Sequence, residues 1–253
     1  MRDQRMIERV LASGSLGFGE AYMAGWWECD HIDQLIERVL LHRIDAEFRR
    51  RPAFILDSLR ARIFNLQAVR RAFRVGEQHY DIGNSLYQRM LDAEMTYTCG
   101  YWKEAHNLEQ AQRAKLDLVC RKLGLREGDR LLDIGCGWGA LARHAARYYG
   151  CEVVGITVSK KQAELAREMC AGLPVEIRLQ DYRDVDEPFN HIASLGMFEH
   201  VGVKNYNTYM RTVRRNLREN GLFLLHTIGS LQSLVTADPW ITRYIFPNSM
   251  LPS

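Results

Sequence analysis

The sequence predicts an α/β protein with a mostly parallel sheet, preceded by a small helical domain. Short apolar runs alternate with helical segments after Gly76, which is typical of buried parallel strands joined by right-handed crossovers. A glycine-spaced turn follows the first apolar run, and glycine lets a backbone approach a ligand closely. Earlier residues show helical periodicity instead, so we expect two domains, residues 1–75 and residues 76–253.

The second domain is expected to contain five strands, each a short apolar run, with helices between them. The expected strands are Arg130–Ile134, Glu152–Thr157, Val175–Leu179, His191–Leu195 and Leu222–His226. The expected helices lie near Glu109–Leu123 and over Ala140–Tyr149, Lys160–Ala171 and Asn205–Arg218.

The first domain is rich in arginine and contains no lysine. Apolar residues recur in it at helical spacing, and we interpret this stripe as the core face of a helix. The stripe consists of Ile32, Leu35, Ile36, Val39 and Leu40.

Residues 49–74 form a strongly basic segment, with eight arginines against Asp57 alone. Arginines interleaved with apolar residues are expected of a basic amphipathic helix at an anionic surface. A solvated helical face is an equal alternative. Lipid head groups and nucleic acid phosphates would both fit the charge of this segment.

The composition excludes several protein classes. The 253 residues are 47% hydrophobic and 26% charged, which is neither collagenous nor disordered. The net charge of +3 is too small to argue for nucleic acid, and the six cysteines form no Cys-x-x-Cys pair that would indicate a disulfide framework or a metal site. No apolar run reaches the ~18 residues of a membrane span. We therefore expect a cytoplasmic protein that is soluble or at most peripheral.

The turn after the first strand is the strongest local signal. It reads Gly135-x-Gly137-x-Gly139, and Asp133 precedes it, where a carboxylate could position the turn or accept hydrogen bonds near the amino group of an amino-acid-like ligand. Dinucleotide binding is the alternative. Against it, the spacing differs from G-x-G-x-x-G, and the second strand runs into Gly155–Ser159 without a carboxylate.

Other side chains could complete a nucleotide site. Thr157 and Gln162 could bind ribose hydroxyls, although Ser159 could simply be the N-cap of the next helix. Asp181 could accept a hydrogen bond from an adenine amino group, and Tyr182 could cover the base.

The glycine turn on its βα repeat resembles the Rossmann-like class I S-adenosylmethionine-dependent methyltransferases. Further segments resemble cyclopropane-fatty-acyl-phospholipid synthases and their mycolic acid relatives, over essentially the whole chain. These segments are Gly14–Trp27, His79–Asn84, Tyr97–Trp102, Met197–Gly202 and Leu225–Gly229.

The resemblance implies transfer of a methylene from S-adenosylmethionine to the cis double bond of an unsaturated phospholipid acyl chain, with bound bicarbonate as the base. It places the bicarbonate at Cys99, Glu199, His226 and Ile228. It places S-adenosylmethionine at Tyr97, Thr98, Asp133, Gly135, Cys136, Gly137, Trp138, Gly139, Thr157, Val158, Gln162, Asp181 and Tyr182.

Glu199 and His226 follow the fourth and fifth expected strands, where open α/β sheets place their ligands. The two side chains could instead merely satisfy one another. Cys99 by itself would be read as a small buried hydrophobe.

The resemblance also implies a peripheral enzyme at the inner face of the membrane. An apolar fifth strand without a neighbour on one side could pair with a second copy, so a homodimer is a further expectation. Family members continue beyond the residue that matches Ser253, and their sheet has seven strands, so we expect the catalytic domain to be incomplete at its C-terminus. The alternatives are a methyltransferase of a small amine or sterol and an inactive membrane-binding fragment.

Overall fold

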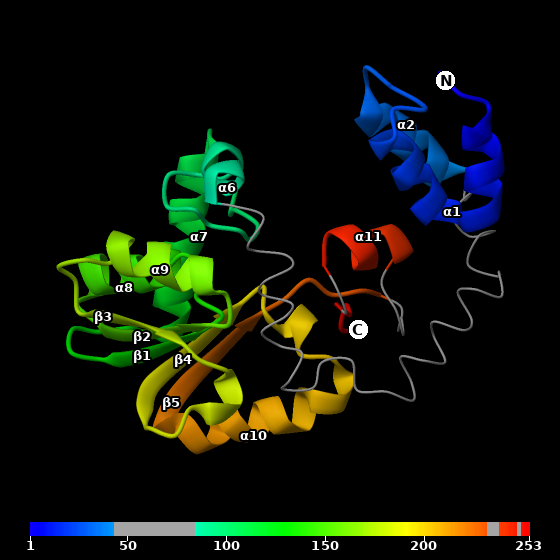
Figure 1. Ribbon diagram of the computed structural model, residues 1–253. Helices are drawn as coiled ribbons and strands as arrows, with labels where there is room; N and C mark the ends of the chain where they lie inside the picture. Colours follow the sequence, from blue (N-terminus) through cyan, green and yellow to red (C-terminus); the bar gives the residue numbers. More distant parts are fainter. Residues whose placement is uncertain (43–83, 232–237, 247–248) are drawn as a thin grey trace. The chain divides into compact units, whose positions relative to one another are not determined.

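The second domain is built on a parallel sheet, as predicted (Figure 1). This computed structural model describes residues 1–42, 84–231, 238–246 and 249–253. Within them, five strands follow the order β3-β2-β1-β4-β5, and all neighbours are parallel. The strands are β1 (Arg130–Ile134), β2 (Glu152–Thr157), β3 (Val175–Leu179), β4 (Phe189–Leu195) and β5 (Leu217–His226).

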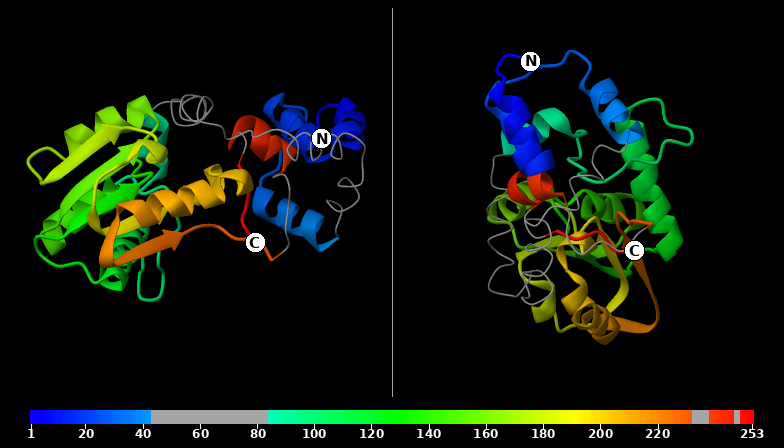
Figure 2. Two further views of the ribbon diagram at one scale, coloured as in Figure 1. Left: turned by 90° about the horizontal axis from the view of Figure 1, so that it is seen from below. Right: turned by 90° about the vertical axis from the view of Figure 1, so that its right-hand side faces the viewer.

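Helices cover both faces of this sheet (Figures 1 and 2). Leu131 and Val153 face α7 and α8, whereas the alternate residues Leu132 and Val154 face α10. Both faces of each central strand are buried, and this is why the strands read as apolar runs in the sequence. The helices are α6 (Asn84–Met90), α7 (Leu108–Leu123), α8 (Ala140–Tyr149), α9 (Lys160–Met169) and α10 (Tyr206–Asn216).

Short 3₁₀ turns lie between these elements in the described part of the chain: η2 (Tyr182–Asp184), η3 (Phe198–His200) and η4 (Val203–Asn205). Capping residues determine where α7 begins and ends. The Asn107 side chain accepts a hydrogen bond from the Gln110 backbone N–H at 2.9 Å, and Gly124 ends the helix with a φ of 64°.

The fifth strand begins earlier than predicted. Leu217 pairs with Phe189 and Leu222 with His191, so residues 218–221 of β5 lie opposite Asn190 alone. Asn220 has a φ of 64° within this bulge. The polar sequence of the bulge does not read as a strand, and only pairing with β4 extends β5 to Leu217.

The chain divides into two compact units, and the second consists of Gln67–Ser233 with Met250–Ser253. The first, Met1–Leu66 with Leu234–Ser249, is helical in its described residues, but the C-terminal segment was not predicted to join it. The expected boundary at residues 75 and 76 lies outside the described residues and stays a prediction. The helices of the first unit are α1 (Arg5–Met23), α2 (Ile32–Leu41) and α11 (Pro239–Tyr244).

Within the first unit, α11 packs directly on α1. A Cβ atom on Gly19 would lie 2.2 Å from Cδ1 of Trp240, so the absence of a side chain at Gly19 lets the indole approach α1. The Tyr244 hydroxyl donates a hydrogen bond of 2.9 Å to Glu20, which also pairs with Arg9.

The predicted core face of α2 is wrong. None of its residues is buried, and Ile32, Ile36 and Leu40 are 40–57% exposed. The spacing does produce one apolar face, but nothing in the described residues buries it. The basic segment 49–74 lies outside the described residues, and among the helices that are described none is long and apolar enough to cross a bilayer.

Gly155 provides a test of the contact between β2 and the glycine turn. A Cβ there would lie 2.8 Å from Ile177 Cδ1 and 3.0 Å from Cys136 Cβ. We expect Gly155→Ala to lower the free energy of unfolding by about 1–3 kcal/mol through overpacking. It should also weaken binding of S-adenosylmethionine, because Cys136 lies in the turn. Urea unfolding and calorimetric titration measure the two effects.

Gly172→Ala is the control, because a Cβ at Gly172 meets no atom within 4 Å and its φ of 79° adds only local backbone strain. It should leave ligand affinity unchanged. Equal affinity in Gly155→Ala and the unaltered chain would show that the turn does not depend on this contact.

Candidate active site

The glycine turn leaves the end of β1 with a backbone that a Cβ would strain. Gly135, Gly137 and Gly139 have φ values of 81°, 56° and 80°. The N–H groups of Gly135 and Cys136 donate to the Ile156 carbonyl at 2.9 and 3.0 Å, which ties the turn to β2. A Cβ on Gly137 would meet no atom within 4 Å, so open space for a ligand borders the turn at this residue.

Two side chains of the turn face the protein interior. Cys136 packs against Ala163 and Ile177, and burial raises the pKa of its thiol. The Trp138 indole N–H donates to Asn84 Oδ1 at 3.0 Å, and the ring is buried. The side chains of Cys136 and Trp138 are thus engaged within the protein, and the contacts of both residues with S-adenosylmethionine stay predictions.

Asp133 stands on β1 just before the turn, as predicted, and is only 2% exposed. Burial raises the pKa of its carboxyl group to about 7, and the Lys115 ammonium acts in the opposite direction. A buried carboxylate at this position can accept hydrogen bonds from a cationic amino group.

The end of β2 has an internal network. Thr157 Oγ1 donates to Gln162 Oε1 at 2.8 Å, and Ser159 Oγ accepts from the Gln162 backbone N–H. Ser159 is thus the N-cap of α9, as the alternative interpretation holds. Val158 is half-buried beside it. The contacts of Thr157, Val158 and Gln162 with S-adenosylmethionine stay predictions.

Asp181 and Tyr182 are buried after β3. The Asp181 carboxylate accepts from the Arg183 backbone N–H at 3.0 Å and from its guanidinium at 2.9 Å. The Tyr182 ring packs edge-on to Tyr209, with centroids 5.1 Å apart, in the core beneath α10. The adenine contacts of Asp181 and Tyr182 stay predictions, and the observed packing of the tyrosine ring is that of a core residue.

The four residues assigned to the anion form two contacting pairs. Cys99 Sγ lies 3.5 Å from His226 Nε2, although the two residues are far apart in the sequence. Glu199 Oε1 accepts a hydrogen bond of 2.7 Å from the Ile228 backbone N–H. As predicted, Glu199 and His226 lie just beyond β4 and at the end of β5. Cys99 is exposed and not the buried hydrophobe of the alternative reading.

Glu199 and His226 do not satisfy one another, so that alternative is wrong. Glu199 is 7% exposed, and within the described part of the chain its Oε2 and the His226 Nδ1 are buried without a hydrogen-bond partner. Burial, followed by the charge of Lys115, lowers the pKa of His226, which keeps the imidazole neutral near pH 7. Buried polar atoms without partners are costly in a folded chain, and a small polar ligand would satisfy them.

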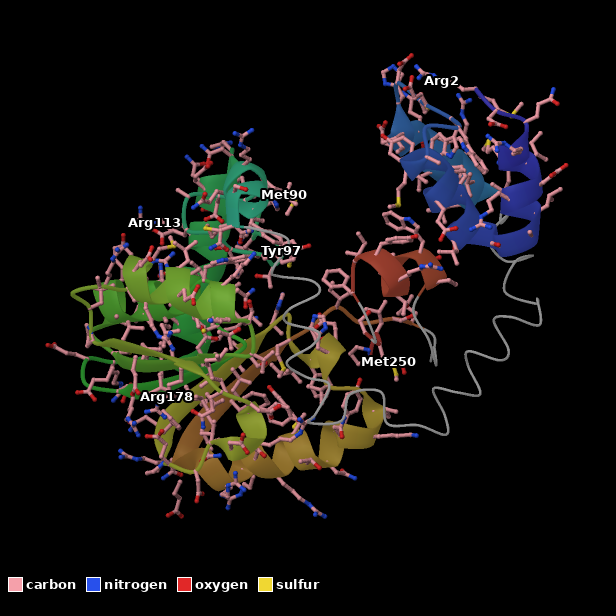
Figure 3. All side chains as sticks on the ribbon, in the orientation of Figure 1. Arg2, Met90, Tyr97, Arg113, Arg178 and Met250 are labelled. Atoms are coloured by element: carbon pink, nitrogen blue, oxygen red, sulfur yellow. The ribbon has the colours of Figure 1, made fainter. Side chains whose placement is uncertain are left out.

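Helix α7 holds the segment that carries Cys99. Gln112 Nε2 donates to the Thr98 carbonyl at 2.7 Å, and Lys115 Nζ donates to Thr98 Oγ1 at 2.7 Å. Tyr97, labelled in Figure 3, is half-buried. Its ring centroid lies 5.3 Å from that of Tyr87 on α6. Sequence reasoning missed Gln112 and Lys115, and the signal was their position among the apolar residues of α7.

The sequence matches the model of a protein family described as mycolic acid cyclopropane synthetase over residues 67–253. The chain belongs to this family. It is also 53% identical to the cyclopropane-fatty-acyl-phospholipid synthase of Escherichia coli K12, over 100% of the chain and 66% of that relative. The chain thus spans just under two thirds of the length of this family relative.

Solved structures of related proteins have a similar fold. Mycolic acid cyclopropane synthase CmaA1, complexed with SAH and CTAB, is 35% identical, with a TM-score of 0.66 over 72% of this chain and 70% of that one. Coclaurine N-methyltransferase, bound to N-methylheliamine and SAH, is 28% identical, with a TM-score of 0.71 over 92% of this chain and 72% of that one. The fold is therefore that of the class I methyltransferases, as predicted.

The raised pKa of Asp133 predicts a dependence of stability on pH. Between its ordinary value of 3.8 and about 7, the folded chain holds a proton that the unfolded chain has released, so stability falls as the pH rises through this range. Asp133→Asn should remove this loss and raise the free energy of unfolding at neutral pH by up to about 4 kcal/mol. Affinity for S-adenosylmethionine should fall in the same variant.

Urea unfolding across this pH range, with ligand titration at its upper end, measures both effects. Asp186→Asn changes an exposed carboxylate and is the control. An unaltered pH profile in Asp133→Asn would contradict the assignment.

Proposed function

We propose that this chain catalyses methylene transfer from S-adenosylmethionine to the cis double bond of unsaturated phospholipid acyl chains, forming cyclopropane fatty acids. The observation that carries this proposal is the two contacting pairs, Cys99 with His226 and Glu199 with Ile228, which leave two buried polar atoms without a hydrogen-bond partner in the described residues. A methyltransferase of a small amine has no need for such a buried arrangement. The name of the Escherichia coli relative supports the same substrate class.

The glycine turn and Asp133 would hold the methyl donor. The open space at Gly137 and the buried carboxylate fit a nucleotide joined to a cationic amino acid. SAH, the demethylated form of S-adenosylmethionine, is named with the CmaA1 structure. When bound, S-adenosylmethionine supplies an electrophilic methyl group on a sulfonium.

The anion site would hold bicarbonate, and the donors and acceptors there fit it. The neutral imidazole of His226 can donate or accept through Nδ1, and Glu199 Oε2 can share a proton with a small oxyanion. Sharing a proton matters because two negative charges would otherwise repel one another. Bicarbonate in this position would supply the base for the reaction.

The protein must position weakly reactive partners and exclude water. The π electrons of the alkene would form the new C–C bond to the methyl carbon as its bond to sulfur breaks, and transfer of one proton from that carbon to the base held at Glu199 and His226 would close the ring. An alkene is a poor nucleophile, so proximity and orientation provide much of the rate. Phe198, which precedes Glu199 in the chain, stacks on Tyr206 with centroids 4.2 Å apart, and Glu199 is itself only 7% exposed, so little water reaches this residue.

We also propose that the protein works in the cytoplasm, at the inner face of the membrane, as a peripheral enzyme. The exposed apolar face of α2 supports this proposal, because Ile32, Ile36 and Leu40 could enter the interfacial region of a bilayer. A homodimer remains a prediction.

Mass spectrometry of unsaturated phospholipid vesicles tests the main proposal. Incubation with the chain, S-adenosylmethionine and bicarbonate should add one methylene to the lipid and remove the reactivity of its double bond. A parallel reaction with small amines tests the methyltransferase alternative. Methylated amine with unchanged lipid would overturn the proposal.

Glu199→Gln tests the role of the carboxylate. We expect the turnover number to fall by about 10²–10⁴-fold, the range for loss of acid–base catalysis, with affinity for S-adenosylmethionine nearly unchanged. Steady-state kinetics and calorimetry separate the two quantities. Glu219→Gln, at an exposed residue of the β5 bulge, is the matched control. Equal loss of turnover and cofactor affinity in Glu199→Gln would count against a role confined to the anion site.

A further inference from the structure

Lys115 is a buried cation that the proposed reaction does not yet use. Its side chain lies on α7, is 5% exposed, and donates to Thr98 Oγ1 at 2.7 Å. Lysine is rarely buried to this degree without a countercharge, because desolvation of an ammonium is costly. The charged and polar groups around Lys115 should therefore explain why a lysine occupies this buried position.

Sheet register places the anion site on the same face as α7. Leu131 and Ala193 pack with α7 and α8 on one face, and Asp133 pairs with Ala193. Ala193 pairs in turn with Leu224 of β5, and His226 follows two residues later on the same face. The helix that carries Lys115 thus covers the face to which Asp133 and His226 belong.

The charges around Lys115 connect it to both halves of the site. The Lys115 ammonium opposes the rise in the pKa of Asp133, and its charge helps to lower the pKa of His226. Thr98, which accepts from Lys115, immediately precedes Cys99 in the chain. The charge of Lys122 also lowers the pKa of His226, but Lys122 is exposed to solvent in the last turn of α7.

The anion site otherwise lacks a positive charge in the described residues that form it. His226 is neutral near pH 7, and Cys99, the Glu199 side chain and the Ile228 N–H carry no positive charge. An oxyanion beside Glu199 would therefore depend on neutral hydrogen bonds alone. The buried Lys115 ammonium on α7 would add electrostatic attraction for the anion, since charge interactions are strong where water is excluded.

We propose that Lys115 is a positioning residue that supplies the countercharge for the anion held by Cys99, Glu199, His226 and Ile228. This inference rests on the proposed function, in which that anion is bicarbonate. Lys115 acts through space and through Thr98, whose hydrogen bond fixes the segment that carries Cys99. It does not need to touch the reacting atoms.

A merely structural lysine would behave differently. Lys115→Met keeps an unbranched, apolar side chain of similar length, so it preserves most of the packing and removes the charge. Lys115→Arg keeps the charge. If Lys115 acts as a countercharge, only Lys115→Met should lose affinity for the anion. If Lys115 acts only through packing, Lys115→Arg, which introduces the bulkier residue, should lower this affinity at least as much.

The inference also predicts a pH dependence. Burial lowers the pKa of Lys115 to about 8, so the ammonium loses its proton as the pH rises through that value. Bicarbonate affinity should then weaken from about pH 7 to about pH 9 in the unaltered chain, and this step should be absent in Lys115→Met. The titratable or charged groups that face Lys115 or its partners are Asp92, Cys99, Lys122, Asp133, His144, Glu199 and His226.

The test is titration of isotopically labelled bicarbonate, followed by NMR, on the full chain saturated with SAH and without lipid. Lys115→Met should weaken bicarbonate binding at least about tenfold near neutral pH, the size of effect expected for loss of a buried charge pair. Lys115→Arg should restore most of the affinity, and Lys122→Met should match the unaltered chain. SAH affinity and urea unfolding in each variant report whether the fold is intact.

Cys99→Ser identifies the group that titrates. Persistence of the pH step in Cys99→Ser, with its loss in Lys115→Met, supports Lys115 as the source. Unchanged bicarbonate affinity in a folded Lys115→Met, or an arginine variant as weak as the methionine variant, would overturn the inference alone. If the unaltered chain bound no bicarbonate, the proposed base and this inference would both fall, whereas lipid cyclopropanation could still be tested by mass spectrometry.

Discussion

The hydrogen bonds from α7 to Thr98 are the constraint on which the candidate site depends. Gln112 and Lys115 lie one helical turn apart and hold both the carbonyl and the hydroxyl of Thr98. They fix the residue next to Cys99, and this lets Cys99 meet His226 from a distant strand. Gly100 also packs closely against Ala111 of α7. A Cβ on Gly100 would lie only 2.8 Å from the Cβ of Ala111, so a side chain at this position would push the segment away from the helix. The irregular segment before α7 is thereby positioned by a regular element.

The candidate site also contains buried polar and charged groups that lower the stability of the folded chain, which a purely apolar core would not. Lys115 and Asp133 are both buried, and desolvation shifts the pKa of each group towards its neutral form. Glu199 and His226 add two buried polar atoms that have no hydrogen-bond partner among the residues that the structure describes. Local rules of folding are commonly violated where a protein binds ligand, and here the violations gather around one edge of the sheet. The candidate site lies at this same edge of the sheet.

Much of the second unit could be predicted from its sequence. Apolar runs located all five strands, because strands buried on both faces leave a continuous apolar pattern. The glycine turn was recognisable because three closely spaced glycines have positive φ values that other residues adopt only with strain. The start of β5 was missed, since only pairing with β4 makes its polar bulge part of a strand. The exposure of α2 was missed for a related reason: periodicity shows that a helix has an apolar face, but not what lies against it.

The sequence by itself determined the parallel α/β class, the turn at the end of β1, and the residue types available at the ends of β4 and β5. These features depend on neighbours in the chain and on the repeat of strand and helix. Only the tertiary structure decided that α7 covers the face shared by Asp133 and His226, that Lys115 is buried there, and that the Glu199 carboxylate accepts its hydrogen bond from the Ile228 backbone N–H. Such contacts join residues that are distant in the sequence, and their existence follows from sheet register and helix packing, which no local pattern encodes.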